Sequence, residues 1–125
     1  MSSHSELFFR TLGTAMAAGL VWIALTPFDP VQLAAASHWY NHYLAHFVVF
    51  AALGSVWSLG FRRTSPLTLV IAIGAFGFAH EALEIVGHAH PLELPDALVN
   101  AAGVVAGVAC VSVLTRVGIV ARTKA

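Results

Sequence analysis

Three apolar stretches of this chain carry histidine, carboxylate and amide side chains at helical spacing. The residues that we expect to form one ligand pocket are His46, His80, Glu81, Glu84, Asp96 and Asn100. Residues four apart lie on the same face of an α-helix, so each stretch would present its polar groups to one side. A carboxylate beside a histidine is sufficient for proton transfer, and such a set can also ligate a divalent metal. The pattern therefore predicts a polar pocket for ligand binding, acid–base chemistry or metal binding.

Metal binding is the first alternative that the spacing raises. The run His80-Glu81-Ala82-Leu83-Glu84 is similar to a zincin helix, but that motif has a second histidine where Glu84 stands. A His/Glu pair one turn apart can still bind a metal, and His46, His88, His90 or Asp96 could complete the ligand shell. We predict no cofactor, and we keep a divalent metal at His80, Glu84, His88 and His90 as an alternative.

Catalysis is the second alternative. Glu81 or Glu84 would act as the general base and His80 or His46 as its proton partner. The outer part of the expected membrane helices, where these residues lie, contains no serine or cysteine. Hydrolysis would therefore need a metal-activated water. The chain also has no glycine-rich phosphate loop and no Gly-x-Ser-x-Gly motif. The sequence therefore favours a non-enzymatic role over a membrane-embedded enzyme.

The elements that must position these residues are membrane helices. The chain has 125 residues, of which 58% are hydrophobic and 10% charged, against about 25% charged in soluble domains. We predict an all-α polytopic membrane protein, a four-helix bundle forming a single domain over residues 1–125. The expected helices are 7–26, 42–61, 67–87 and 96–114, each long enough to cross a bilayer.

The basic residues indicate how the helices are oriented. They lie at the start of the first expected helix, in the second loop and after the fourth helix: Arg10, Arg62, Arg63, Arg116, Arg122 and Lys124. The loops Pro27–Asn41 and His88–Leu94 contain no lysine or arginine. Cytoplasmic loops of membrane proteins carry an excess of basic residues. We therefore expect a protein of the bacterial plasma membrane with both termini on the cytoplasmic side. The pocket would then face outward.

A pair of glycines continues the Asp96/Asn100 face of the last expected helix. Gly103 and Gly107 make a small-xxx-small pattern, which lets two helices approach closely. The sequence leaves open whether the neighbouring helix belongs to this chain or to another protein. A homo-oligomer or hetero-oligomer through the last helix is therefore one expected kind of assembly, beside contact with the lipid bilayer itself.

Two stretches carry a family resemblance. They are His46-Phe47-x-x-Phe50-x-x-Leu53-Gly54, and Gly77-x-x-x-Glu81-x-x-Glu84 followed by Asp96-x-x-x-Asn100-x-x-Gly103-x-x-x-Gly107. Together they resemble the VanZ-like family of small bacterial membrane proteins. The chain departs from the family pattern at His42-Tyr43, where Asp-Lys is common, and at Glu84, where Gln is common. It also lacks the family's external-loop arginine, which argues against phosphate binding in the pocket.

The resemblance implies a four-helix membrane fold and links the family's namesake to resistance against the glycopeptide antibiotic teicoplanin. With the predicted pocket, it favours binding or handling of an amphipathic envelope lipid or cell-wall precursor. The alternatives are a structural or assembly subunit packing through Gly103 and Gly107, an acid–base or metal-dependent enzyme, and a proton-coupled transporter. We expect no nucleic-acid partner, because the chain has few basic residues and the membrane orientation accounts for where they lie.

Overall fold

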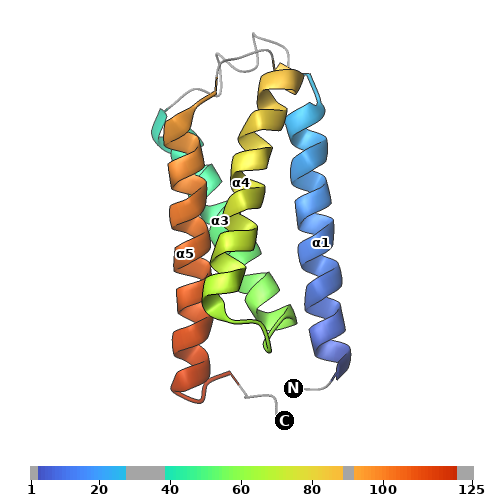
Figure 1. Ribbon diagram of the computed structural model, residues 1–125, viewed down its shortest axis with the longest axis vertical. Coiled ribbons are helices and arrows are strands. Elements are labelled where there is room, and N and C mark those ends of the chain that lie inside the picture. The colour runs from blue at the N-terminus through green and yellow to red at the C-terminus, as the bar shows by residue number, and fades with distance from the viewer. Residues whose placement is uncertain (1–2, 28–38, 89–91, 121–125) are drawn as a thin grey trace.

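The described part of the chain folds into a bundle of four α-helices. The computed structural model describes residues 3–27, 39–88 and 92–120, with only the backbone at 39–41. The helices are α1 (Ser3–Leu25), α3 (Trp39–Gly60), α4 (Pro66–His88) and α5 (Leu94–Arg116), and no strand occurs in these ranges (Figure 1). The predicted all-α four-helix fold is confirmed.

Each helix is long and apolar enough to cross a membrane. A helix of 23 residues such as α4 spans about 34 Å, slightly more than the hydrocarbon core of a bilayer. Large apolar side chains face outward around the bundle, for example Trp22, Leu67, Ile71 and Val86, each more than half exposed. An outer surface of this kind requires lipid as its solvent, so the chain is a multi-pass membrane protein.

The helix ends differ from the predicted ones by up to four residues. At the starts of α4 and α5, the reason is that a proline lies in the first helical turn instead of in the loop before it. Helix α5 has Pro95 in its first turn and begins at Leu94, two residues before the predicted start. Helix α4 begins at Pro66, and Ser65 Oγ accepts a hydrogen bond of 3.1 Å from the Thr68 N–H. Proline has no N–H to leave unsatisfied, so the first turn of a helix tolerates it.

Consecutive helices run in opposite directions, so each end of the bundle is made of different parts of the chain (Figure 1). Figure 1 shows the start of α1, the end of α5 and the turn between α3 and α4 at one end. The end of α1, the start of α3, the end of α4 and the start of α5 lie at the other end. Helices α3 and α4 each contact both α1 and α5. We call the two ends the terminal end and the loop end.

The closest helix pair is α3 with α5, and glycines make its contact possible. A Cβ atom on Gly103 would meet the backbone of Phe47 and Ala51, and one on Gly107 would meet the backbone of Ala51 and Ser55. The helix that approaches Gly103 and Gly107 is therefore α3 of the same chain. A partner protein would have to pack on another face of α5, which answers the question that the sequence left open.

An apolar core lies between the helices. Phe50 and Leu53 of α3, Ile73 of α4 and Val104 of α5 are essentially inaccessible to solvent and pack together. The Phe50 ring also lies edge-on to the His80 ring, with 5.7 Å between centroids. The core thus continues directly into the polar residues described next, which lie on its loop-end side.

Candidate functional site

The polar residues predicted to form a pocket converge near the loop end of α3, α4 and α5. We define the polar cluster as His42, His46, His80, Glu81, Glu84, Asp96 and Asn100. All six residues predicted for the pocket belong to it, and the seventh, His42, was not predicted as a site residue. The four-residue spacing to His46 was the signal that would have identified His42. Five of the members are buried: His80, Glu81, Glu84, Asp96 and Asn100.

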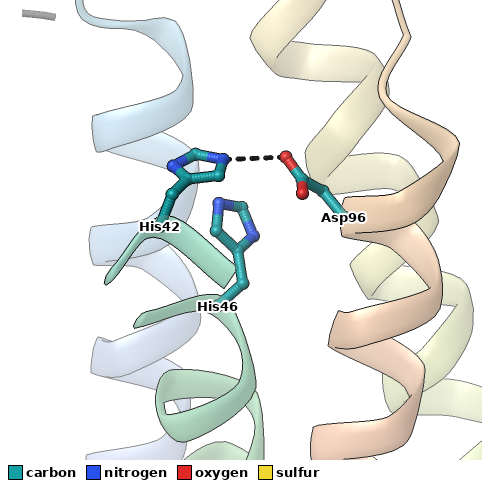
Figure 2. A group of neighbouring side chains, drawn as sticks. All are labelled: His42, His46 and Asp96. Atoms are coloured by element: carbon teal, nitrogen blue, oxygen red, sulfur yellow. Dashed lines mark hydrogen bonds and ion pairs between the residues drawn. The ribbon is translucent and has the colours of Figure 1, made fainter. Parts of the chain in front are cut away.

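The outermost contact of the cluster joins α3 to α5. His42 Nε2 lies 2.8 Å from Asp96 Oδ2 (Figure 2). The Asp96 side chain is 3% exposed, whereas that of His42 is 50% exposed. Asp96 is in the first turn of α5, where the helix dipole favours a negative charge. The pair therefore connects a buried carboxylate to a histidine that reaches the surface of the bundle.

One turn deeper, Asn100 links a histidine to a second carboxylate. Asn100 Nδ2 donates a hydrogen bond of 2.6 Å to Glu81 Oε1, and Asn100 Oδ1 lies 2.9 Å from His46 Nδ1. His46 Nδ1 is also 3.6 Å from the same Glu81 oxygen. Because an amide oxygen can only accept, His46 must carry its proton on Nδ1 in this arrangement. Asn100 thus sets the tautomer of His46 and holds Glu81 in place.

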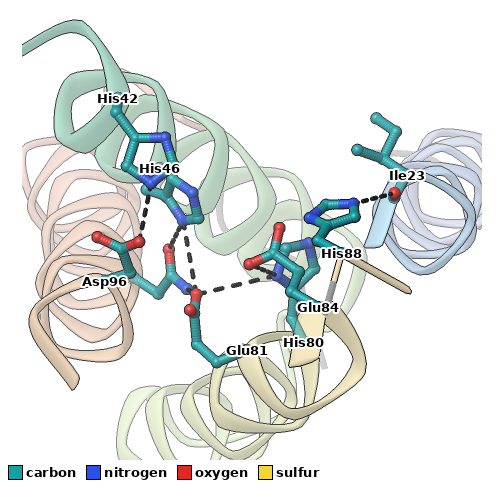
Figure 3. A network of polar contacts seen from close by, with 9 residues as sticks. Ile23, His42, His46, His80, Glu81, Glu84, His88 and Asp96 are labelled. Atoms are coloured by element: carbon teal, nitrogen blue, oxygen red, sulfur yellow. Dashed lines mark hydrogen bonds and ion pairs between the residues drawn. The ribbon is translucent and has the colours of Figure 1, made fainter. Parts of the chain in front are cut away.

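On α4, the acids flank a histidine. His80 Nδ1 lies 3.7 Å from Glu84 Oε2 and 3.9 Å from Glu81 Oε1 (Figure 3). Within the described part of the chain, neither ring nitrogen of His80 makes a hydrogen bond, and the same holds for Glu81 Oε2 and Asp96 Oδ1. Buried polar atoms normally have partners. The cluster therefore has spare hydrogen-bonding capacity that a ligand, an ion or water can use.

A small residue on α4 allows α5 to approach the cluster. A Cβ atom on Gly77 would lie 3.3 Å from both the Asn100 Cβ and the Phe50 ring. Gly77 is one turn before Glu81 on the same helix face, so its missing side chain leaves space for Asn100. This gives the Gly77-x-x-x-Glu81 spacing a packing role beside the acid.

The residues that could together bind a metal differ from the set predicted from the sequence. Two groups in the described residues bring possible ligand atoms within 4.8 Å of one another: His42, His46 and Asp96, and His46, Glu81 and Glu84. Glu84 belongs to one of these groups. His46 and Asp96, which were expected as further ligands, are also members, whereas His80 and His88 belong to neither group. His88 Nε2 instead lies 3.2 Å from the carbonyl oxygen of Ile23 in α1 (Figure 3). His90 lies outside the described residues.

The cluster's charges come from carboxylates and histidines only. The arginines of the described helices and turns, Arg10, Arg62, Arg63 and Arg116, belong to the terminal half of the bundle. Two glutamates and an aspartate therefore face three histidines. No lysine or arginine takes part in any of the contacts between described residues of the cluster. Such a set can accept hydrogen bonds, exchange protons or ligate a cation.

Comparison of the chain with protein-family models, with curated proteins and with solved structures gives no match in any of the three.

Proposed function

We propose that this protein is a VanZ-like inner-membrane protein whose polar cluster binds or handles the polar head of an amphipathic envelope lipid or cell-wall precursor. In this proposal both termini are cytoplasmic, and the cluster lies toward the outer leaflet of a bacterial plasma membrane. The orientation rests on the arginines at the terminal end, which follow the bias of cytoplasmic loops.

The observation that carries the proposal is the contact of half-exposed His42 with buried Asp96, 2.8 Å apart. Ionisable groups inside membrane segments are costly and usually functional. Side chains that only hold helices together can be wholly enclosed, as the Asn100–Glu81 pair is. His42 instead connects the enclosed groups to the loop end, where a ligand at headgroup depth would arrive.

The free atoms of the cluster suggest which ligand chemistry it prefers. Glu81 Oε2 and Asp96 Oδ1 are hydrogen-bond acceptors without a donor in the described chain. Acceptors of this kind match hydroxyl, amide or ammonium groups, as in sugar or amino-acid headgroups. A bare phosphate would meet carboxylates without an arginine or lysine, so it is the less favoured headgroup chemistry.

The test compares isosteric variants in a strain that lacks the gene. Glu81→Gln and Asp96→Asn keep side-chain size but remove the charge, and we expect both to lose function while remaining abundant in the membrane. The readouts are envelope stress, glycopeptide sensitivity and the lipids that co-purify with each variant, measured by mass spectrometry. Glu6→Gln is the matched control, because Glu6 is an acid at the terminal end. Wild-type behaviour of both cluster variants would overturn the proposal.

A second candidate is a metal site, favoured by the two groups that share His46. A His/carboxylate set suits zinc or another first-row divalent metal. A bound metal could activate water for acid–base chemistry on the same headgroup. Elemental analysis of the purified protein separates this candidate from simple headgroup binding. Less than one metal in ten chains after metal supplementation would argue against it.

A further inference from the structure

A recessed region lies at the terminal end, away from the polar cluster. It is a cavity of about 600 Å³ between the end of α3, the turn to α4, the start of α4 and the end of α5. This volume is typical of small-molecule pockets. We call it the arginine cavity, because Arg62, Arg63 and Arg116 line it.

The arginine cavity is strongly positive. Among the described residues, its lining contains three arginines and no acidic residue. Among the described acids, only Glu6 lies toward this end, and its Oε2 is 3.4 Å from Arg10 Nη2, outside the lining. The first turn of α4 also borders the cavity at Pro66, and a helix N-terminus adds partial positive charge. Three like charges around one recess favour an anionic occupant.

The rest of the lining divides into hydroxyls and an apolar wall. Ser112 Oγ donates to the Val108 carbonyl at 2.8 Å, and Thr115 Oγ1 donates to the Val111 carbonyl at 2.8 Å. The Ser58 hydroxyl likewise donates to the Gly54 carbonyl at 2.7 Å. The side-chain donors that the lining offers an anion are therefore chiefly its guanidinium groups, beside the Thr64 hydroxyl. Leu69, Val108 and Val111 are buried apolar residues of the lining, so the anion should carry a hydrocarbon part.

We propose that the arginine cavity binds an anionic phospholipid, with its phosphate on the arginines and the start of an acyl chain on the apolar wall. The cavity lies at the end of the membrane-spanning helices, which is the depth of lipid headgroups. In the orientation proposed above, this leaflet is the cytoplasmic one, whose anionic lipids attract basic residues. Free phosphate would meet the arginines but would make no use of the apolar part of the lining, which includes Leu69, Val108 and Val111.

Lipid binding to the purified full-length chain in a neutral detergent tests this proposal. The probes are phosphatidylglycerol, phosphatidylcholine with the same acyl chains, and inorganic phosphate, with binding measured by native mass spectrometry and by the shift in unfolding temperature. We expect retention of phosphatidylglycerol over phosphatidylcholine. Arg63→Gln/Arg116→Gln should weaken it about thirtyfold, since each basic side chain near an anionic surface contributes a factor of about five.

Two further variants separate a site from general charge attraction. Arg122→Gln/Lys124→Gln removes the same number of charges outside the described residues and should leave the lipid preference in place. Ser112→Phe keeps every charge but fills the cavity, and it should also displace the lipid. The proposal is overturned if the tail variant weakens binding as much as the Arg63/Arg116 variant, if Ser112→Phe binds normally, or if inorganic phosphate stabilises the protein as well as the lipid does. Helicity by circular dichroism confirms that each variant is folded.

Discussion

Asn100 donates its amide hydrogen to Glu81 Oε1 at 2.6 Å, and this bond joins α5 to α4 inside the polar cluster. The same amide faces His46 Nδ1 through its oxygen at 2.9 Å. With the amide turned the other way, its oxygen would face the Glu81 carboxylate, and two acceptors would oppose each other. One side chain thus orients both a histidine and a carboxylate from two other helices.

Replacing Asn100 by alanine should destabilise the bundle. Glu81 Oε1 would lose its buried donor, and an unsatisfied buried polar group costs about 1–3 kcal/mol. Thermal unfolding in detergent, followed by circular dichroism, measures the loss. Ser112→Ala is the control, because that hydroxyl bonds only within its own helix. Equal stability of Asn100→Ala and Ser112→Ala would contradict the role assigned to Asn100.

The glycine face of α5 should tolerate no large side chain. Gly107→Leu would force α5 away from the Ala51 backbone, and overpacking of this kind costs about 1–3 kcal/mol or more. Gly74→Leu is the matched control, since nothing lies within 4 Å of a Cβ built there. We expect low membrane abundance for Gly107→Leu and normal abundance for Gly74→Leu, as judged by immunoblotting. The reverse ranking would mean that α3 and α5 do not pack as described.

The His42–Asp96 pair should contribute little to stability despite its short distance. The His42 side chain is 50% exposed whereas that of Asp96 is 3% exposed. Water therefore screens the histidine side of the contact, and we expect a coupling of about 1 kcal/mol or less. A double-mutant cycle of His42→Ala and Asp96→Asn, measured by unfolding in detergent, gives the coupling energy. If the pair serves ligand handling, His42→Ala should impair function at unchanged abundance. A coupling of several kcal/mol would instead assign the pair to holding α3 against α5.

If the cluster takes up a divalent metal, His46 should be its key ligand. His46 belongs to both possible metal groups, so His46→Ala should abolish binding of added zinc or manganese. His88→Ala is the control, because His88 faces the Ile23 carbonyl instead. Calorimetric titration of the purified variants measures the affinity. Loss of binding in His88→Ala with retention in His46→Ala would place the metal elsewhere.

Membrane orientation can be tested with single cysteines. In a Cys110→Ala background, Ser65→Cys places a thiol in the turn between α3 and α4, and Leu92→Cys places one before α5. A membrane-impermeant maleimide added to intact cells should label Leu92→Cys only. This follows from the arginines beside Ser65, which favour the cytoplasmic side. Labelling of Ser65→Cys alone would invert the orientation and put the polar cluster inside.

The helical architecture could be predicted from the sequence because membrane spans have a simple requirement. A helix must satisfy its own backbone and show about 20 apolar residues to lipid, and both conditions are local. The helix starts were less predictable. Pro95 is compatible with either a loop or a first helical turn, and only the complete backbone shows that α5 begins at Leu94.

The contacts within the polar cluster could not be predicted from the local sequence. The constant rise of an α-helix, counted from the expected ends of the spans, predicted one depth for His46, Glu81, Asp96 and Asn100. Four-residue spacing predicted in addition that Asp96 and Asn100 share a helix face. Which of them touch, and that His42 joins them, depends on the rotation of each helix about its axis. That rotation is decided by long-range packing, as where the backbone of α3 meets the glycine face of α5. The sequence by itself determined the spans and the depth of the polar groups, and only the tertiary structure decided their partners.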